Sequence, residues 1–561
     1  MAKENGGVDY FTLEVIQQAL VAVGDEMFTV LQRTAHSPLI FETLDFAVGA
    51  TDGAGELICM GNGTTGFLGT LDASVREVIK KHDATMEPED IYILNSPYLG
   101  GGSHLSDISL VMPVFHAGEI IAFTVNKAHW TEVGGKDPGS VASDATEIYQ
   151  EGLQFPVVKL CSRGAINPAI VDLIRSNVRL PDMTLGDMWA GIATLRMGAE
   201  RVRALVEKYG VAAVKTAMDG FLDYGERMAR AELAKLPKGT FKATDFIDED
   251  AHGNGPFEIA CAVTITDDAF VVDFTGSHPQ VRSPINTTLT NLTSRARSVY
   301  RAVTTPHIPT NGGMYRPLKV ICPPGTIFTA EPPLPTSVYY ETAVMGTDLI
   351  WKALAPHMPD RLPAGHYATV GGMRLAGDDP ETGEFWLSFG PYLGGWGAEC
   401  DRDGQRGQFC VSNGQTYNVP IELQEARYSV QIARYGFHNE PGGFGEFCGG
   451  HGVALDFRIT SDTATMMAGL GRHKFRPWGM NGGQGGTINY VKVVRGDGSE
   501  EVYGRVARVD LERGDLVSLV TGTGGGYGDP RRRDPTRVRE DLKNGYITTE
   551  QAAEVFGVRG A

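Results

Sequence analysis

Two histidines and an aspartate lie within one short stretch of the chain and could hold a metal ion together. His104 and Asp107 come just before an apolar run at 108–115, and His129 follows a second apolar run at 120–125. Imidazole nitrogens and carboxylate oxygens are common ligands of divalent transition metals in proteins. The three side chains would form such a site if the two runs bring them to one place.

The two runs have the length and composition of β-strands, and the link between them at 116–118 contains glycine, so the stretch predicts a hairpin. Pairing across this link places Asp107 opposite Lys127. Because side chains alternate between the faces of a sheet, Asp107 and His129 would then share one face as diagonal neighbours, about 7–8 Å apart. The spacing leaves two interpretations open: a metal site, or histidines that only form hydrogen bonds at strand ends.

A fourth candidate ligand, Asp45, directly precedes an apolar strand predicted at 46–50. A carboxylate in that position is more often a turn residue. With His104, Asp107 and His129 it would form a ligand set of nitrogen and oxygen without thiolate, which suits manganese, iron or zinc better than magnesium or copper(I). If one coordination position stayed open, the metal would lower the pKa of a bound water to about 7 and polarise a carbonyl group.

Further acidic residues follow the hairpin closely enough in sequence to lie near such a metal: Glu132, Asp144, Glu147 and Glu151. Carboxylates around metal ligands orient them and tune the ion, so Glu132, Asp144 and Glu147 are candidates for a second layer of groups around the site. The other interpretation is that these side chains face solvent on a loop and a helix.

The expected fold class is α+β, with several domains, mixed and antiparallel sheets, packed helices and a glycine-rich β region toward the C-terminus. Apolar residues at helical spacing predict helices at 12–34 and between 168 and 235. The expected units are a metal-bearing α+β domain at 1–238, a central α/β segment at 239–360, a glycine-rich β region at 361–530 and a helical tail at 531–561.

The chain has 561 residues and a formal net charge of -18, which argues against nucleic acids as partners because binding to phosphates needs a basic surface. It has no apolar run of about 18 residues, and its start lacks the apolar core of a signal peptide, so we expect no membrane association. The seven cysteines include no CxxC pair, which is typical of reduced thiols. These features predict a cytoplasmic protein.

The 71 glycines gather in loops, most densely at 442–452, 479–486 and 521–530. None of these loops matches GxGxxG between a strand and a helix, or GxxxxGK[ST], the motifs that cradle nucleotide phosphates. We therefore interpret them as tight turns and close backbone contacts, and we expect no ATP-binding site in this chain.

Several motifs resemble those of the hydantoinase B family: NSPYLGGGSHLSDISLV at 95–111, NKAHWTEVGGKDPGS at 126–140, DATEIYQEGLQFPVVKL at 144–160 and GGGYGDP at 524–530. The first three are specific, and the resemblance runs along nearly the whole chain. Members form one half of ATP-dependent hydantoinases, 5-oxoprolinases, caprolactamases and ketone carboxylases. The resemblance implies that four residues bind a divalent metal, namely Asp45, His104, Asp107 and His129.

The resemblance also implies a partner, a hydantoinase A-type subunit that holds ATP, in a hetero-oligomer with several copies of each chain. That partner would phosphorylate the carbonyl oxygen of a small-molecule substrate, a cyclic amide. A water on the metal held by this chain would then attack the activated carbonyl, so that Asp107 and His129 act in catalysis through this water. In the ketone carboxylase branch, a phosphorylated enol would meet carbon dioxide at the same centre.

Hydrolysis of a cyclic amide is the leading prediction for this chain. The alternatives are a subunit of an ATP-dependent ketone carboxylase of acetone or acetophenone type, and a structural subunit whose metal is only a staple. A closed site with four protein ligands would favour the staple, whereas an open position would favour catalysis. The segments FETLDFAVGATD and GNGTTGFLGTLDAS depart from the common family pattern, which leaves the substrate open.

Overall fold

A seven-stranded antiparallel sheet forms the N-terminal part of the molecule in the computed structural model, which describes residues 9–411 and 413–558. Its strand order is β2-β1-β5-β4-β3-β6-β7, so the predicted hairpin, β4 and β5, lies at its centre. The strands are β1 (Phe46–Asp52), β2 (Leu57–Met60), β3 (Ile91–Leu94), β4 (Asp107–His116), β5 (Glu119–His129), β6 (Val158–Ser162) and β7 (Ala165–Ile166).

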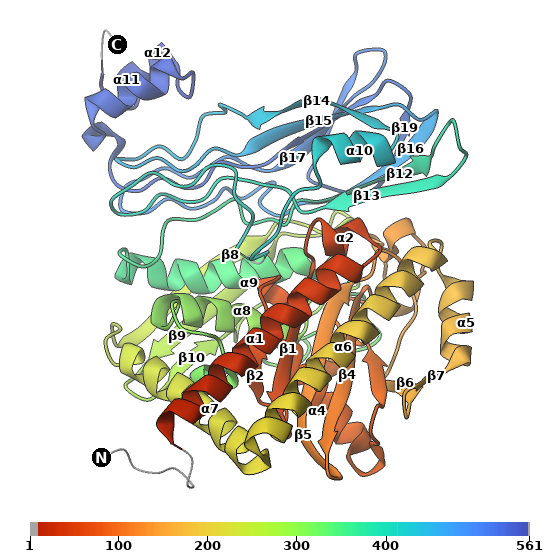
Figure 1. The fold of residues 1–561 in the computed structure, drawn as a ribbon. Coiled ribbons are helices and arrows are strands. Elements are labelled where there is room, and N and C mark those ends of the chain that lie inside the picture. The colour runs from red at the N-terminus through yellow and green to blue at the C-terminus, as the bar shows by residue number, and fades with distance from the viewer. Residues whose placement is uncertain (1–8, 412, 559–561) are drawn as a thin grey trace.

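Helices cover both faces of this sheet. The long helices α1 (Tyr10–Thr34) and α6 (Pro181–Tyr209) cross one face, and α4 (Leu71–His82) lies against the other (Figure 1). Alternation along the strands explains this arrangement, because Leu110 packs into the core under α1 and α6 while Val111 packs into the core under α4. Shorter or flanking helices are α2 (Pro38–Phe41), α3 (Thr65–Leu68), α5 (Pro168–Asn177) and α7 (Val211–Leu233).

The hairpin forms as predicted, but its register was predicted wrongly by two residues. Asp107 pairs directly with His129, and not with Lys127. One residue of the shift comes from the turn, which contains only Ala117 and Gly118, both at positive φ as two-residue hairpin turns require. The other comes from a bulge beside Val114. Because two single shifts restore the alternation, the ligands stay on the predicted face.

A four-stranded sheet of order β11-β10-β9-β8 follows, with helices α8 (Leu289–Thr304) and α9 (Tyr339–Leu354) packed on it. It is mixed, because β11 runs parallel to β10 whereas the other pairs are antiparallel. Helix α7 contributes residues to the core of this sheet and to the core of the seven-stranded sheet, so the two cores are joined through one helix. The domain boundary at residue 238 therefore remains a prediction from sequence. The strands are β8 (Gly239–Ile247), β9 (Phe257–Ile265), β10 (Phe270–Asp273) and β11 (Leu318–Ile321).

The C-terminal part contains two further sheets that share one hydrophobic core, at the top of Figure 1. One has the order β13-β12-β16-β19 and the other β14-β15-β20-β17-β18. Their strands are β12 (Gly372–Asp378), β13 (Phe385–Gly390), β14 (Val430–Phe437), β15 (Val453–Ile459), β16 (Thr463–Gly469), β17 (Tyr490–Val494), β18 (Glu500–Tyr503), β19 (Arg505–Glu512) and β20 (Leu516–Val520). Helix α10 (Ile421–Arg427) precedes β14, and α11 (Pro535–Lys543) and α12 (Thr549–Glu554) form the predicted helical tail.

The glycine-rich loops of this part pack backbone against backbone, as the sequence predicted. The amide of Gly524 donates to the carbonyl of Gly450 at 3.0 Å, and the amide of Gly525 donates to that of Gly365 at 2.7 Å. A Cβ atom on Gly524 would lie 2.1 Å from the carbonyl oxygen of Trp396, so any other residue would separate the loops.

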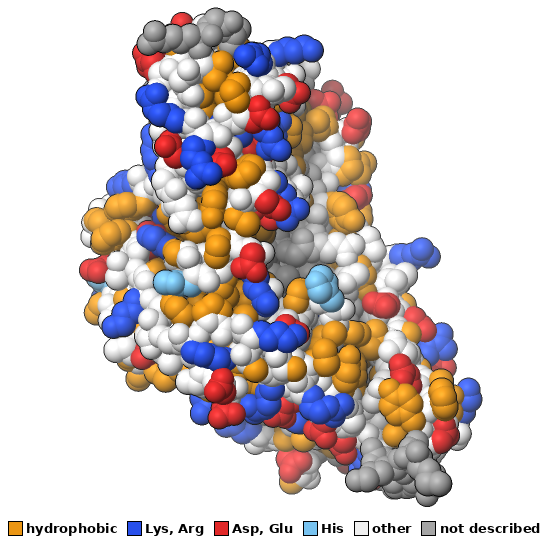
Figure 2. Space-filling view, turned by 90° about the vertical axis from the view of Figure 1, so that its left-hand side faces the viewer, with side chains coloured by type: hydrophobic (Ala, Val, Ile, Leu, Met, Phe, Trp, Pro, Cys, Tyr) orange, Lys and Arg blue, Asp and Glu red, His pale blue; other side chains and the backbone are white. Residues whose placement is uncertain are grey.

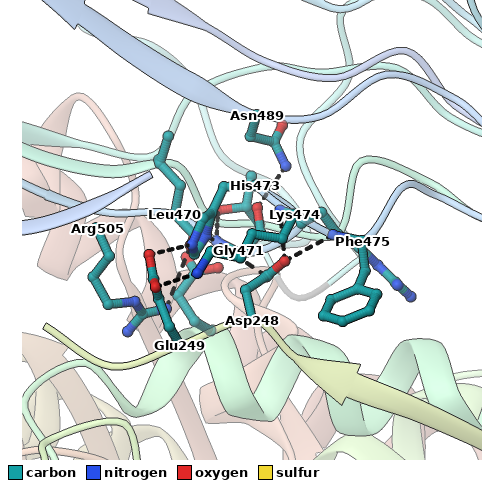
Figure 3. Close-up of polar contacts among 12 residues, drawn as sticks. Asp248, Glu249, Leu470, Gly471, His473, Lys474, Phe475, Asn489 and Arg505 are labelled. Carbon is teal, nitrogen blue, oxygen red and sulfur yellow. Dashed lines mark hydrogen bonds and ion pairs between the residues drawn. The ribbon is translucent and has the colours of Figure 1, made fainter. Parts of the chain in front are cut away.

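A polar cluster joins the central sheet to the C-terminal part, and we call it the junction cluster: Asp248, Glu249, His473 and Lys474 (Figure 3). His473 Nδ1 lies 2.8 Å from the carbonyl oxygen of Leu470, and its Nε2 lies 3.0 Å from Glu249 Oε1. The Lys474 ammonium pairs with the same carboxylate of Glu249. These contacts fix the loop after β16 against the loop after β8.

Within the described part of the chain, no helix has the length and apolar character needed to cross a bilayer. On the face shown in Figure 2, basic, acidic and hydrophobic side chains are interspersed.

Candidate metal centre

Four side chains meet at the open end of the central hairpin, and we call them the ligand group: Asp45, His104, Asp107 and His129. His104 Nε2 lies 3.1 Å from Asp107 Oδ1 and 3.2 Å from His129 Nδ1, and the last two atoms are 3.3 Å apart. A metal with bonds of about 2.0–2.2 Å holds neighbouring ligand atoms about 3.0–3.5 Å apart. The three buried groups therefore have the spacing of a coordination shell, and Asp45 Oδ2 lies beside them, 3.8 Å from His129 Nδ1.

The sheet pairing positions these residues. Asp107 and His129 face each other as the last pair of β4 and β5. Strand β1 pairs with the other edge of β5, and the His129 amide donates to the carbonyl of Asp45 at 3.0 Å, which places Asp45 opposite His129. Leu44, just before Asp45, adopts a positive φ of 62° that is costly for a branched side chain. This strained residue directs the chain into β1 at the site.

Hydrogen bonds orient the nitrogens of His104. Its Nδ1 lies 3.1 Å from the carbonyl oxygen of Ser337, so Nδ1 carries the proton that is donated there. In the neutral ring, Nε2 is then an acceptor that faces both Asp107 and His129. A single proton on Nε2 would have to serve several acceptors at once, whereas a cation between them would bind every lone pair.

Electrostatics favour the deprotonated carboxylate of Asp107. Burial alone would raise the pKa of Asp107, but the neighbouring His104 and His129 outweigh burial and hold that pKa well below its usual range. For His104, burial alone would lower the pKa, but the charge of Asp107 and the hydrogen bond to it raise the value overall. Burial raises the pKa of Asp45, although His129 offsets part of the effect. The group thus attracts positive charge, whether protons or a metal.

A cavity of about 50 Å³ adjoins the ligand group, and residues from all three parts of the chain line it. That volume holds an ion with a few waters, since one water needs about 10–15 Å³. The lining includes Tyr339 and Arg295 from the central part and Phe389 from β13. The Tyr339 hydroxyl donates to Asp107 Oδ2 at 3.3 Å, and the Phe389 ring stacks on His129 at a centroid distance of 6.2 Å.

Sequence reasoning missed these neighbours of the ligand group. Ser337, Tyr339 and Phe389 are distant from the hairpin in sequence, and no local pattern links them to it. Arg295 had one usable signal, because it is a charged residue on the buried face of an apolar-periodic helix. Thr64 also escaped sequence reasoning; it donates to Asp45 Oδ1 at 3.1 Å from the glycine-rich segment before α3.

The acidic residues proposed as a second layer have other partners. Glu132 is buried, accepts hydrogen bonds from the Gly134 and Gly139 amides and pairs with Arg179. Asp144 pairs with Lys136. These contacts correct the expectation for both residues, because loop folding and a partly exposed ion pair occupy their carboxylates.

Glu147 also differs from its expected role, because it is exposed and caps a single helical turn. Glu151 is the acidic residue that does connect to the site. Its carboxylate accepts the amides of Thr336 and Ser337 at 2.8 and 2.7 Å, and the Ser337 carbonyl in turn contacts His104. Burial raises the pKa of Glu151 to about 8.

A larger cavity of about 400 Å³ shares Leu39 and Phe389 with the small one. Its walls are largely aromatic and aliphatic, with Phe41, Trp386 and Tyr428 among them. Such a volume and lining fit the body of a small organic molecule whose polar group reaches the ligand group.

Comparison with known proteins identifies the family. The family described as Hydantoinase B/oxoprolinase matches residues 9–530. The chain belongs to this family. It is 31% identical to a protein of Pseudomonas sp. (strain NS671) assigned as the B-type subunit of a D-/L-hydantoinase, over 98% of this chain and 95% of the relative.

Two solved structures have a similar fold. The chain superposes on the ATP-dependent caprolactamase of Pseudomonas jessenii with a TM-score of 0.92 at 29% identity, covering 99% of this chain and 97% of the other. The nucleotide-free acetone carboxylase structure gives a TM-score of 0.91 at 19% identity, covering 98% and 79%, a likeness of fold. The relatives include proteins named as subunits of a hydantoinase and of a caprolactamase, so membership in this family supports the role of an enzyme subunit.

Proposed function

We propose that this chain is the metal-binding subunit of an ATP-dependent hydrolase of cyclic amides. One observation carries the proposal: His104 Nε2, His129 Nδ1 and Asp107 Oδ1 converge to within 3.3 Å of one another beside a cavity. Two relatives, a hydantoinase B-type subunit and a caprolactamase beta subunit, are each 31% identical over nearly the whole chain and support a cyclic amide as the substrate class. An A-type subunit would bind ATP, in an assembly with several copies of each chain.

The ligand group would hold a divalent manganese, zinc or iron ion. When bound, such an ion polarises a carbonyl and lowers the pKa of a water. The Ser337 carbonyl keeps the free lone pair of His104 toward the centre, and Tyr339 holds one oxygen of Asp107 so that the other remains available. The aromatic cavity beside Phe389 would take the ring of the substrate and exclude bulk water from its carbonyl.

Activation by ATP has a chemical reason. An unstrained amide is stabilised by resonance and is a poor electrophile, whereas phosphorylation of its oxygen by the partner subunit removes that resonance and makes the carbon electrophilic. Water adds to this carbon and the ring C–N bond breaks to release the amine. A second water then hydrolyses the resulting acyl phosphate to carboxylate and phosphate. The activated substrate then needs a site that supplies water, and the ligand group has the donors to hold an ion that does so. The fold shared with acetone carboxylase makes ketone carboxylation the second candidate, since carbon dioxide would replace water as the reactant.

Co-purification with the A-type subunit tests the proposal. We expect about one metal equivalent per chain and ATP-dependent ring opening of hydantoin, 5-oxoproline or caprolactam without bicarbonate. ATP turnover that requires bicarbonate and a ketone such as acetophenone would replace hydrolysis by carboxylation. Metal content far below one equivalent in an active preparation would refute both. If His129→Ala lost metal and stability but kept activity, the metal would be only structural.

A further inference from the structure

Arg295 places a buried guanidinium at the wall of the small cavity, and no carboxylate among the described residues forms an ion pair with it. The residue is 3% exposed, and within the described residues neither its Nε nor its Nη1 has a hydrogen-bond partner. Burial lowers the pKa of Arg295, and Tyr339 and Asp107 offset this only in part. Its partner is the Tyr339 hydroxyl, which carries no opposite charge. A buried charge without a carboxylate beside it is costly to a folded protein, so its retention at a cavity indicates a ligand of opposite charge.

The surrounding helices hold this guanidinium in place. On the same helix, Arg297 forms two hydrogen bonds of 2.9 Å to Asp72, which fixes α8 against α4. The Ser294 hydroxyl donates to the carbonyl of Gly66 at 2.9 Å, which fixes α8 against α3. A Cβ atom on Gly66 would lie 2.5 Å from Arg295 Nη1, so a larger residue there would displace the guanidinium from its present position. The local sequence is thus fitted to Arg295.

The charges around the cavity favour an anion. Asp45 and Asp107 together balance the two positive charges of a divalent ion, and neutral histidines add none. Arg295 then leaves one positive charge in excess. A neutral substrate would leave this excess uncompensated.

We propose that Arg295 binds a small oxyanion group, a phosphoryl or a carboxylate group, next to the ion held by the ligand group. A planar guanidinium with free donors matches two oxygens of such a group. The oxyanion could come from the activated carbonyl, as its phosphoryl group, or from the ring-opened product, as its carboxylate. The inference rests on the proposed function, and metal content is measured separately so that either can fail alone.

Titration of the full-length chain, loaded with Mn²⁺, with inorganic phosphate and with acetate tests the inference. Calorimetry gives the two dissociation constants, and the Mn²⁺ EPR spectrum reports an anion that arrives beside the ion. We expect wild type to bind at least one of the two anions, and the tighter one identifies the source. Arg295→Met should weaken this binding at least tenfold while Mn²⁺ content stays near wild type.

Arg301→Met is the matched control, because Arg301 lies on the same helix and lines other cavities. It should bind both anions as wild type does. Arg295→Lys keeps the charge but loses the two parallel N–H donors of the guanidinium, so its anion affinity should lie between those of wild type and Arg295→Met. If Arg295→Met does not fold, Arg295→Lys provides the test. Unchanged anion affinity in Arg295→Met, or in Arg295→Lys where only that variant folds, overturns the proposal. If wild-type protein binds Mn²⁺ but neither anion, the anion proposal is also overturned, while the proposed metal site is supported.

Discussion

The ligand group and the junction cluster begin alike. In each, a histidine Nδ1 lies against a backbone carbonyl, that of Ser337 for His104 and that of Leu470 for His473, while Nε2 faces a carboxylate. A motif search that looks only for histidine beside aspartate or glutamate would not separate them. The difference lies in what the carboxylates contact next.

In the junction cluster both oxygens of Glu249 and one oxygen of Asp248 have their own donors. Glu249 binds His473 through one oxygen and the Lys474 ammonium through the other, and Asp248 accepts the amides of Lys474 and Phe475 (Figure 3). Burial alone would raise the pKa of Glu249, but Lys474 and His473 outweigh it and lower the value. Glu249 is thus satisfied within the cluster, and among the described residues the ligand atoms close enough to share a metal ion are those of His104, Asp107 and His129.

In the ligand group, by contrast, several lone pairs converge on one point. The junction cluster pairs its carboxylate with a lysine, whereas the ligand group has a second imidazole, that of His129, and a further carboxylate, that of Asp45. A small cavity adjoins them. Convergence of acceptors beside free space therefore distinguishes a candidate metal centre from a structural ion pair.

Removing one ligand should produce the largest effect. His104→Ala deletes a donor from the centre, so we expect metal content below about a tenth of wild type and activity of the complex reduced about 10³-fold or more, since the water loses its activation. Elemental analysis and ATP-dependent ring opening measure both. His473→Ala is the matched control and should keep its metal; loss of metal from both variants would end the distinction between the clusters.

The pH dependence of metal binding should be the next largest effect, because protons compete for the same lone pairs. Burial would lower the pKa of His104, but Asp107 raises it overall, so competition begins above the ordinary imidazole value near 6.5. Through protonation of His104, affinity should fall by up to about tenfold per pH unit on the acid side. Titration with Mn²⁺ between about pH 5.5 and 8.5 checks this.

Thermal stability of the metal-free protein should fall as pH rises, whereas its metal affinity should rise. A raised folded-state pKa of His104 means that its protonation stabilises the fold fully below the unfolded pKa, and this contribution is lost as pH rises through the folded pKa. Metal-loaded protein should gain stability over the same range. Glu151 is present in both forms, so its raised pKa contributes to both curves. If the melting temperature changed with pH in the same way with and without Mn²⁺, the predicted role of His104 protonation would be contradicted.

A smaller effect should follow from removing support behind His104. Glu151→Ala deletes the acceptor that holds the amides of Thr336 and Ser337, so the Ser337 carbonyl should orient His104 less well. Losses from such outer groups are about 10- to 100-fold in metal affinity, and we expect about tenfold. Glu147→Ala, an exposed residue nearby in sequence, should leave metal affinity unchanged; equal losses in the two variants would remove Glu151 from the support.

Much of the hairpin could be predicted because its signals are local. Strand lengths, the glycine in the turn and alternation are enough to place Asp107 and His129 on one face. The bulge beside Val114 could not be predicted, since it depends on packing between strands. That the face was right although the register was wrong by two residues shows how strongly alternation alone constrains a site.

The remainder of the site depends on distant parts of the chain. Asp45 joins the group through pairing of β1 with β5, and His104 is oriented by Ser337, more than two hundred residues away. Sequence spacing cannot reveal such contacts, and the resemblance to the hydantoinase B family supplied Asp45 instead. Proximity in sequence also misled, because Asp144 and Glu147 follow the hairpin closely and yet have other partners.

Breaking the junction cluster should have no effect on metal binding. His473→Ala removes a buried ring with two hydrogen bonds and leaves Glu249 with only the exposed Lys474, so the free energy of unfolding should fall by about 1–3 kcal/mol. Chemical denaturation measures this loss, and His252→Ala, an exposed histidine, should stay within about 0.5 kcal/mol of wild type. Because the junction joins two parts of the chain whose residues both line the candidate site, unchanged metal content in His473→Ala would show that the ligand group is held by its own sheet. A parallel fall in metal affinity would instead make the junction part of the site's support, and the two clusters would no longer be independent.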